Sequence, residues 1–168
     1  MTNLAGAAGG IAAMLTVWAL FKKPDVGMTV NGFLAGMVAI CSAVDCVSVY
    51  SSVIIGAVAG VLVVLSVLFI ERTLKVDDPV GAVSVHGVCG TWGTLAYAFF
   101  GTEFSMKVLA AQLIGIGTGF AWAFGCGMIL FLGIKYTIGL RVTEEEEITG
   151  LDITEHGNEA YSGIGMAV

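Results

Sequence analysis

The stretch Asp77-Asp-Pro-Val-Gly-Ala-Val-Ser-Val-His-Gly-Val-Cys-Gly-Thr-Trp-Gly-Thr-Leu-Ala96 places two acids before a long apolar run that begins with a proline. The run extends from Pro79 to Thr102, and His86 is its only ionisable side chain apart from cysteine and tyrosine. A helix needs about 20 apolar residues to cross the hydrocarbon core of a bilayer. We therefore expect this run to span a membrane and to carry a histidine within it.

The residues before this run indicate where its helix begins. Proline is tolerated in the first helical turn, so Pro79 is expected there. Asp77 and Asp78 come just before it, where the helix dipole favours negative charge. The pattern indicates a helix cap, and a cation-attracting mouth is the alternative.

Further uncharged apolar runs lie on both sides of this one: Leu4–Phe21, Val26–Val44, Cys46–Ile70 and Val108–Ile134. The composition agrees, because 57% of the 168 residues are hydrophobic and only 12% are charged. Soluble domains are about 25% charged. In lipid, a helix satisfies its own backbone polar groups. We expect an all-α integral membrane protein with five transmembrane helices, which argues against a soluble enzyme and a nucleic-acid binder.

The charges divide the chain near Arg141. All 7 Lys and Arg residues lie in residues 1–141, whereas residues 142–168 contain Asp and Glu but no Lys or Arg. We expect a transmembrane region over 1–141 and an acidic tail over 142–168. The basic residues that follow the first, third and fifth runs outnumber Lys107 on the other side: Lys22, Lys23, Arg72, Lys75, Lys135 and Arg141. Because basic loops stay in the cytoplasm, the tail is expected to be cytoplasmic.

His86 is the residue that the sequence favours for chemistry. It follows Asp78 by eight positions, which is ~12 Å along an α-helix and inside the hydrocarbon zone. Ionisable side chains at that depth usually face a bundle interior or a pathway. A structural histidine bonded to a neighbouring backbone or hydroxyl group is the alternative. A zinc site is disfavoured because Cys89 is its only candidate partner.

Asn31 is the other strongly polar side chain deep within a run. It lines a path or makes a hydrogen bond between helices, and the sequence does not decide between these two roles. The surrounding run contains Gly32 and Gly36, one of several Gly-x-x-x-Gly pairs that predict close helix packing. The other pairs are Gly6/Gly10, Gly56/Gly60 and Gly115/Gly119.

The acidic tail contains its own helix signals. Thr143 and Glu146 have the spacing of a capping box, which predicts a short acidic helix. Gly150 is expected to end that helix, because glycine adopts the backbone conformations found at helix C-termini. A solvated run of charges is the alternative to any ligand site in this tail.

Three stretches resemble the ammonium transporter (Amt) family. Asp77–Ala96 is similar to the helix that carries a pore histidine, Val30–Ile40 to the eighth helix, and Gly139–Tyr161 to the cytoplasmic tail. Members have eleven spans in which the first ten form two inverted halves, with the N-terminus outside. The resemblance implies that this chain corresponds to helices seven to eleven plus the tail. We therefore expect it to be the C-terminal part of a longer protein or of a split subunit.

The resemblance also implies roles for individual residues. In the family, two histidines line a narrow hydrophobic pore, and His86 matches the second. Asn31 matches a polar pore position beside it, and Asp78 and Ala82 match the inner mouth. The first histidine belongs to the half that is missing from this sequence.

For assembly and regulation, the resemblance implies a homotrimer in the plasma membrane with one pore per subunit. In the family, the tail packs against a neighbouring subunit, and PII-type signalling proteins plug the inner mouth of bacterial members. Thr154 matches a phosphorylation position of plant members, and Gly150 and Asp152 belong to the same regulatory stretch. Phosphate at Thr154 is expected to disrupt a docked tail through its charge.

The sequence leaves three hypotheses about function. The first is transport of ammonium or ammonia for nitrogen uptake, without a cofactor. The second is an ammonium sensor that signals rather than conducts, and the third is a non-conducting fragment. An enzyme is disfavoured because no pair of nucleophile and base is present.

Overall fold

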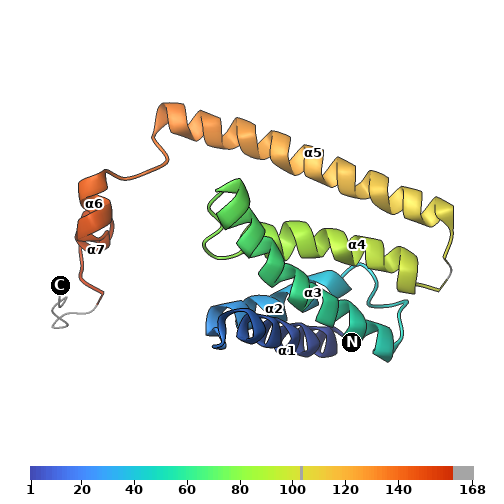
Figure 1. Cartoon of the computed structure of the whole chain (residues 1–168). Coiled ribbons are helices and arrows are strands. Elements are labelled where there is room, and N and C mark those ends of the chain that lie inside the picture. Colours follow the sequence, from blue (N-terminus) through green and yellow to red (C-terminus); the bar gives the residue numbers. More distant parts are fainter. Residues whose placement is uncertain (103, 161–168) are drawn as a thin grey trace. The chain divides into compact units, whose positions relative to one another are not determined.

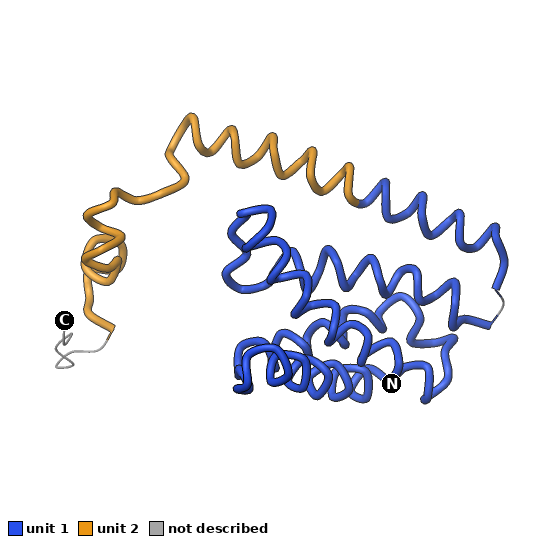
Figure 2. Tube along the Cα trace, in the orientation of Figure 1, with its two compact units in different colours: residues 1–119 blue, residues 120–168 orange. Residues whose placement is uncertain are grey.

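The structure is a computed structural model that describes residues 1–102 and 104–160, and in these residues it is helical without strands (Figure 1). It divides into two compact units, residues 1–119 and 120–168 (Figure 2). The elements follow in the order α1 (Thr2–Phe21), α2 (Val26–Ile40), α3 (Val49–Phe69), η1 (Ile70–Leu74), η2 (Val83–Val88), α4 (Cys89–Phe100), α5 (Met106–Thr137), α6 (Glu144–Thr149) and α7 (Asp152–His156). The expected all-α fold is confirmed.

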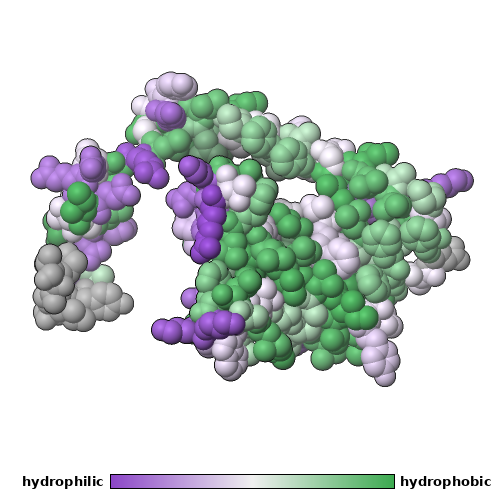
Figure 3. Space-filling view, viewed as in Figure 1, coloured by the Kyte–Doolittle hydropathy of each residue, from purple (hydrophilic) through white to green (hydrophobic). Residues whose placement is uncertain are grey.

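Helices of membrane-spanning length form part of the chain. Among the described residues, the helices over Thr2–Phe21, Val49–Leu74 and Met106–Thr137 are long and apolar enough to cross a bilayer. Val26–Ile40 is apolar but has only 15 residues. In the first unit, hydrophobic side chains cover most of the visible surface (Figure 3), as expected of a surface that faces lipid. The count of five spans stays a prediction.

Two helix ends differ from the expectations. The second run was expected to be helical to Val44, but α2 ends at Ile40 because tighter turns follow, with Ala43 N–H donating to Ile40 O over 3.1 Å. Pro79 was expected in the first turn of the next helix, but it lies in a separate turn before that helix. The reason is Gly81, which has φ +70° and donates its N–H to Asp78 O over 2.8 Å, so the helix begins only after it.

Close approach between backbones holds α1, α2 and α3 together. A Cβ at Gly36 or at Gly56 would overlap the carbonyl group of Ala5, and one at Gly60 would overlap that of Gly9. Small residues permit such contact between membrane helices. Close packing is therefore confirmed for Gly32/Gly36 and Gly56/Gly60, whereas the tight contact on α1 is made by Gly9 and not by the expected pair Gly6/Gly10. Gly115 and Gly119 on α5 have no neighbour within 4 Å of an added Cβ in the described chain, so this pair makes no close helix contact among the described residues.

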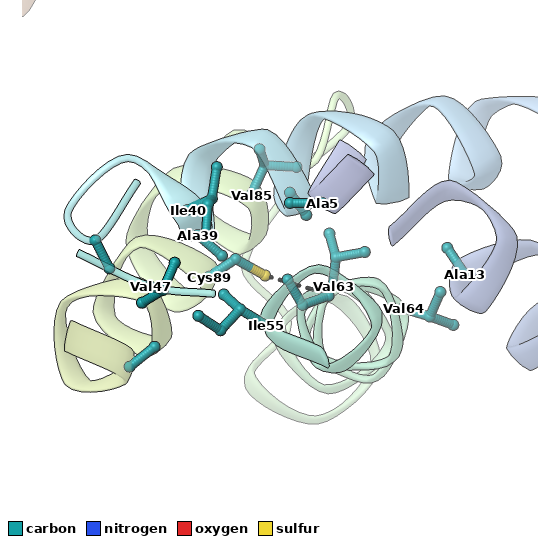
Figure 4. Packing of buried hydrophobic residues seen from close by; sticks show 14 of the residues in the cluster. Ala5, Ala13, Ala39, Ile40, Val47, Ile55, Val63, Val64, Val85 and Cys89 are labelled. Atoms are coloured by element: carbon teal, nitrogen blue, oxygen red, sulfur yellow. Dashed lines mark hydrogen bonds between the residues drawn. The ribbon is translucent and has the colours of Figure 1, made fainter. Parts of the chain in front are cut away.

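The core of the first unit joins α3 to the histidine-bearing helix. Figure 4 shows Ile55 and Val63 of α3 with Cys89 of α4, and each is fully buried. The Sγ atom of Cys89 lies 3.5 Å from the carbonyl oxygen of Ala59 on α3. Trp92 adds a second link between these helices, because its Nε1–H donates to Ile55 O over 3.0 Å. These contacts fix α4 against α3.

We predict that Gly56→Ala destabilises the folded protein by about 1–3 kcal/mol, because the added methyl group overlaps the Ala5 backbone. Gly119→Ala is the matched control, since its methyl group meets open space and improves helix propensity. Thermal unfolding in detergent, followed by circular dichroism, measures both. Equal melting temperatures for the two variants would contradict the packing described here.

Candidate functional site

His86 lies on η2, a six-residue π-helix that continues directly into α4. The side chains of η2 divide into two sides. Ser84 and Val85 are buried, whereas Val83, His86 and Gly87 are exposed. The histidine thus lies on the outer side of the first unit, while the opposite side of the same segment is buried in the core.

The π-helical form of η2 is itself informative. The hydrogen bonds of a π-helix span one more residue than those of an α-helix, so a π-turn inserts one extra residue, and such segments occur frequently at functional sites. The extra residue changes which side of the helix each later side chain faces. The direction of His86 therefore depends on how this segment is held.

Asp78 holds the start of the segment. Its Oδ1 accepts the backbone N–H of Val83 over 3.0 Å, and its Oδ2 accepts the backbone N–H of Ser84 over 3.1 Å. The Asp78 side chain is only 3% exposed. The expected helix cap is therefore confirmed at Asp78, although the capped turn begins further along the chain than Pro79. A role for Asp78 at the inner mouth stays a prediction.

A serine pair extends the cap toward α3. Ser84 Oγ donates to Asp78 Oδ2 over 3.0 Å, and Ser66 Oγ donates to Ser84 Oγ over 3.0 Å. Ser84 is fully buried. Neither serine was predicted as a functional residue from the sequence, where the only available signal is a hydroxyl group within an apolar run.

Asn31 was expected to line a path or to make a hydrogen bond between helices, and the bond that it makes goes to a loop instead of a helix. Its Nδ2 donates to the carbonyl oxygen of Val80 over 3.3 Å, which connects α2 to the loop before η2. A Cβ at Gly81 would lie 2.7 Å from this Nδ2 atom, so glycine is required there for space as well as for its φ. The expected place of Asn31 in a pathway is not tested by this bond.

The structure thus brings the predicted pathway residues to one end of one helix. Asp78 and Asn31 hold the loop that precedes η2, and Ala82 and His86 are exposed one helical turn apart. Within the described residues, no group of three or more His, Cys, Asp or Glu side chains is arranged to hold a metal ion.

In the second unit, the capping box of the tail is confirmed. Thr143 Oγ1 accepts the N–H of Glu146 over 3.3 Å, and Glu146 Oε2 accepts the N–H of Thr143 over 2.9 Å. Gly150 ends α6 with φ +98°, as expected. Residues 161–168 of the expected tail lie outside the described residues.

The predicted regulatory residues of the tail lie on or beside α7. Thr154 is exposed within that helix. Asp152 Oδ2 accepts the N–H of Ala160 over 2.9 Å, which closes a compact turn after α7. A phosphate on Thr154 would therefore add negative charge to a short helix in which the carboxylate of Asp152 already accepts a backbone hydrogen bond.

We predict that Asp78→Asn lowers the free energy of unfolding by about 1–3 kcal/mol, because an amide NH₂ group would face backbone donors that need an acceptor. Asp77→Asn is the control, since Asp77 is exposed and its replacement should cost less than about 0.5 kcal/mol. Thermal unfolding of the two variants in detergent tests this. A destabilisation of similar size in both variants would show that the carboxylate of Asp78 does not stabilise the start of η2.

The tail should respond to acid through Glu146. The hydroxyl and backbone N–H of Thr143 hold the pKa of the Glu146 carboxyl below its ordinary value. A carboxyl with a lowered folded pKa stabilises α6 above the unfolded pKa, and this stabilisation is lost as the pH falls through the folded pKa. NMR titration of Glu146 should give this low pKa, and Thr143→Ala should raise it toward the usual value. An unchanged pKa in Thr143→Ala would contradict the capping box.

Comparisons with known proteins identify the family of the chain. The model of the Ammonium Transporter Family matches residues 1–161. The chain is 44% identical to ammonium transporter Amt2 of Archaeoglobus fulgidus over 177 residues, which cover 95% of this chain and 38% of that protein. This chain thus spans about two fifths of the length of that relative.

Solved structures give the same result. A structure described as a sensor Amt protein is similar with a TM-score of 0.87 and 40% identity, over 92% of this chain and 40% of that one. Mep2 of Saccharomyces cerevisiae is similar with a TM-score of 0.76 and 28% identity, over 86% of this chain and 36% of that one. The family and the sequence relative named above are ammonium transporters rather than enzymes. The match over residues 1–161 and the apolar helices show that the chain is a member of the ammonium transporter family and belongs to the integral membrane proteins.

Proposed function

We propose that this chain forms the C-terminal part of a subunit that conducts ammonium or ammonia across a membrane, with His86 in the pathway. One observation carries the proposal: the imidazole of His86 lies on the exposed side of a π-helical segment within an otherwise apolar run. An ionisable group within an apolar membrane segment usually faces a bundle interior or a pathway. The names of the relatives support ammonium as the substrate.

The physical chemistry of the substrate suits such a site. A bare ammonium ion is costly to place in hydrocarbon, whereas neutral ammonia is far less costly. A narrow apolar path excludes hydrated sodium and potassium ions for the same reason. An uncharged imidazole donates a hydrogen bond with one ring nitrogen and accepts with the other. His86 would therefore contact the substrate at the point where water is excluded.

The neighbouring residues have supporting roles in this proposal. Ala82 lies one turn before His86 on the exposed side, and its small side chain leaves room at the inner mouth. Asn31 and Asp78 hold the loop and the first turn that carry Ala82. Both would therefore act on the pathway through the backbone as well as through their polar groups.

The assembly that we propose follows from the length of the chain and from the family. A second half would cover the exposed side of η2 and supply the other pore histidine, since this chain spans 38% of a relative. We further propose a homotrimer in the plasma membrane with a cytoplasmic tail. Gly150, Asp152 and Thr154 would then form a regulatory stretch, and a PII-type protein would bind at the cytoplasmic face.

Ammonium sensing is the second candidate function. The observation that favours it is the similarity to a structure described as a sensor Amt protein, with a TM-score of 0.87. A sensor and a transporter would share the binding chemistry of His86. They differ in whether the substrate reaches the other side of the membrane.

Uptake of radiolabelled methylammonium into proteoliposomes tests the proposal on the assembled protein. We expect His86→Ala to reduce the initial rate at least about tenfold, which corresponds to about 1.4 kcal/mol of lost stabilisation at the barrier. His156→Ala is the control, because this second histidine lies in the tail and should leave the rate unchanged.

An unchanged rate in His86→Ala would contradict the pathway role of this residue. A wild-type protein that binds methylammonium without moving it would favour the sensing function instead.

A further inference from the structure

A buried chain of hydrogen bonds connects α3 to the segment that carries His86. Ser66 Oγ donates to Ser84 Oγ, which donates to Asp78 Oδ2, and both oxygen–oxygen distances are 3.0 Å. Ser84 is fully buried and Asp78 is 3% exposed, while Ser66 is half-buried. The chain thus runs through the interior of the first unit, on the side of η2 that faces away from the exposed residues.

The direction of these bonds is set by the carboxylate. Ser84 Oγ donates its hydroxyl proton to Asp78 Oδ2, and a hydroxyl group has a single proton to donate. The Ser84 oxygen is then left to accept from Ser66. Consecutive hydrogen bonds of this kind polarise one another and are stronger together than apart in a medium of low dielectric constant. Removal of Ser66 should therefore weaken the bond between Ser84 and Asp78.

This chain of bonds acts on the backbone form of η2. Asp78 binds the N–H groups of Val83 and Ser84, and Ser84 is also bound through its side chain. An α-helix turns ~100° per residue, so the extra residue of a π-turn shifts later side chains by about that angle. If η2 changed to an α-helix while α4 stayed in place, the exposed side chains of η2, including His86, would point in a different direction.

We propose that Ser66 and Ser84 are positioning residues that hold η2 in its π-helical form and thereby fix the direction of the His86 imidazole. Ser84 is held on the buried side, and His86, two residues later, is directed to the opposite side. The consequence for transport rests on the proposed function. The proposed effect on the direction of His86 does not rest on the proposed function, because it is argued only from the hydrogen bonds of Ser66, Ser84 and Asp78.

The experiment compares Ser66→Ala and Ser84→Ala with Ser52→Ala in the assembled protein. Ser52 is a matched control because it is fully buried on the same helix as Ser66, yet its Oγ donates only to Val49 O, over 2.7 Å. Ser66→Thr is the rescue variant, since it keeps the hydroxyl at a half-buried position. Two quantities are measured: the nitrogen chemical shifts of the His86 imidazole in bilayers, by solid-state NMR, and the rate of methylammonium uptake.

We expect Ser66→Ala and Ser84→Ala to shift the His86 nitrogen signals, while Ser52→Ala leaves them in place and Ser66→Thr restores them. Uptake should fall about threefold to tenfold in Ser66→Ala, the change expected when one buried hydrogen bond is lost, and at least as much in Ser84→Ala, which loses the bonds to both Ser66 and Asp78. The signals of His156 in the tail serve as an internal reference that should not move.

The two readouts separate the proposals. If the wild-type protein moves no methylammonium but the His86 signals still shift in Ser66→Ala, the positioning role is supported and the transport function fails. If the His86 signals are the same in wild type, Ser66→Ala and Ser84→Ala, the positioning role is overturned whatever the uptake rate. A shift of equal size in Ser52→Ala would also overturn it, because any lost buried hydroxyl would then suffice.

Discussion

The bonding of one buried carboxylate, that of Asp78, determines how the rest of the site is built. A carboxylate enclosed in an apolar bundle is strongly unfavourable unless donors surround it. Here the donors are the backbone N–H groups of Val83 and Ser84 and the Ser84 hydroxyl. To offer both N–H groups, the helix must start after the turn at Gly81, and its first segment is π-helical. The exposed position of His86 follows from that start.

The packing of the first three helices makes this arrangement possible. Glycines allow α1 to lie directly against the backbones of α2 and α3, with Ala5 and Gly9 at the contacts. The same packing fixes α3, which presents Ser66 to Ser84 and accepts the Trp92 indole at Ile55. Further along α4, Ser42 Oγ donates to Gly93 O over 2.6 Å, which ties the turn after α2 to the same helix. The helix that carries His86 is thus held along its length.

The sequence alone predicted the features that depend on local pattern. Apolar runs predicted the helices, the spacing of Thr143 and Glu146 predicted the capping box, and acids before an apolar run predicted a cap at Asp78. The features that it missed depend on contacts between distant segments or on one residue in a turn. Pro79 was assigned to a helix because nothing local reveals that Gly81 adopts φ +70°. Ser66 and Ser84 are eighteen residues apart, so only the fold shows that their hydroxyl groups meet.

The central claim is that the bonds at Asp78 direct His86 toward a pathway. A density map of the assembled protein in a lipid nanodisc tests it most directly. The account predicts a π-helical turn at residues 83–88, with the His86 imidazole lining a narrow channel between this chain and a second set of helices. A map in which His86 faces acyl chains, or in which this turn is α-helical and Asp78 is exposed to water, would contradict it.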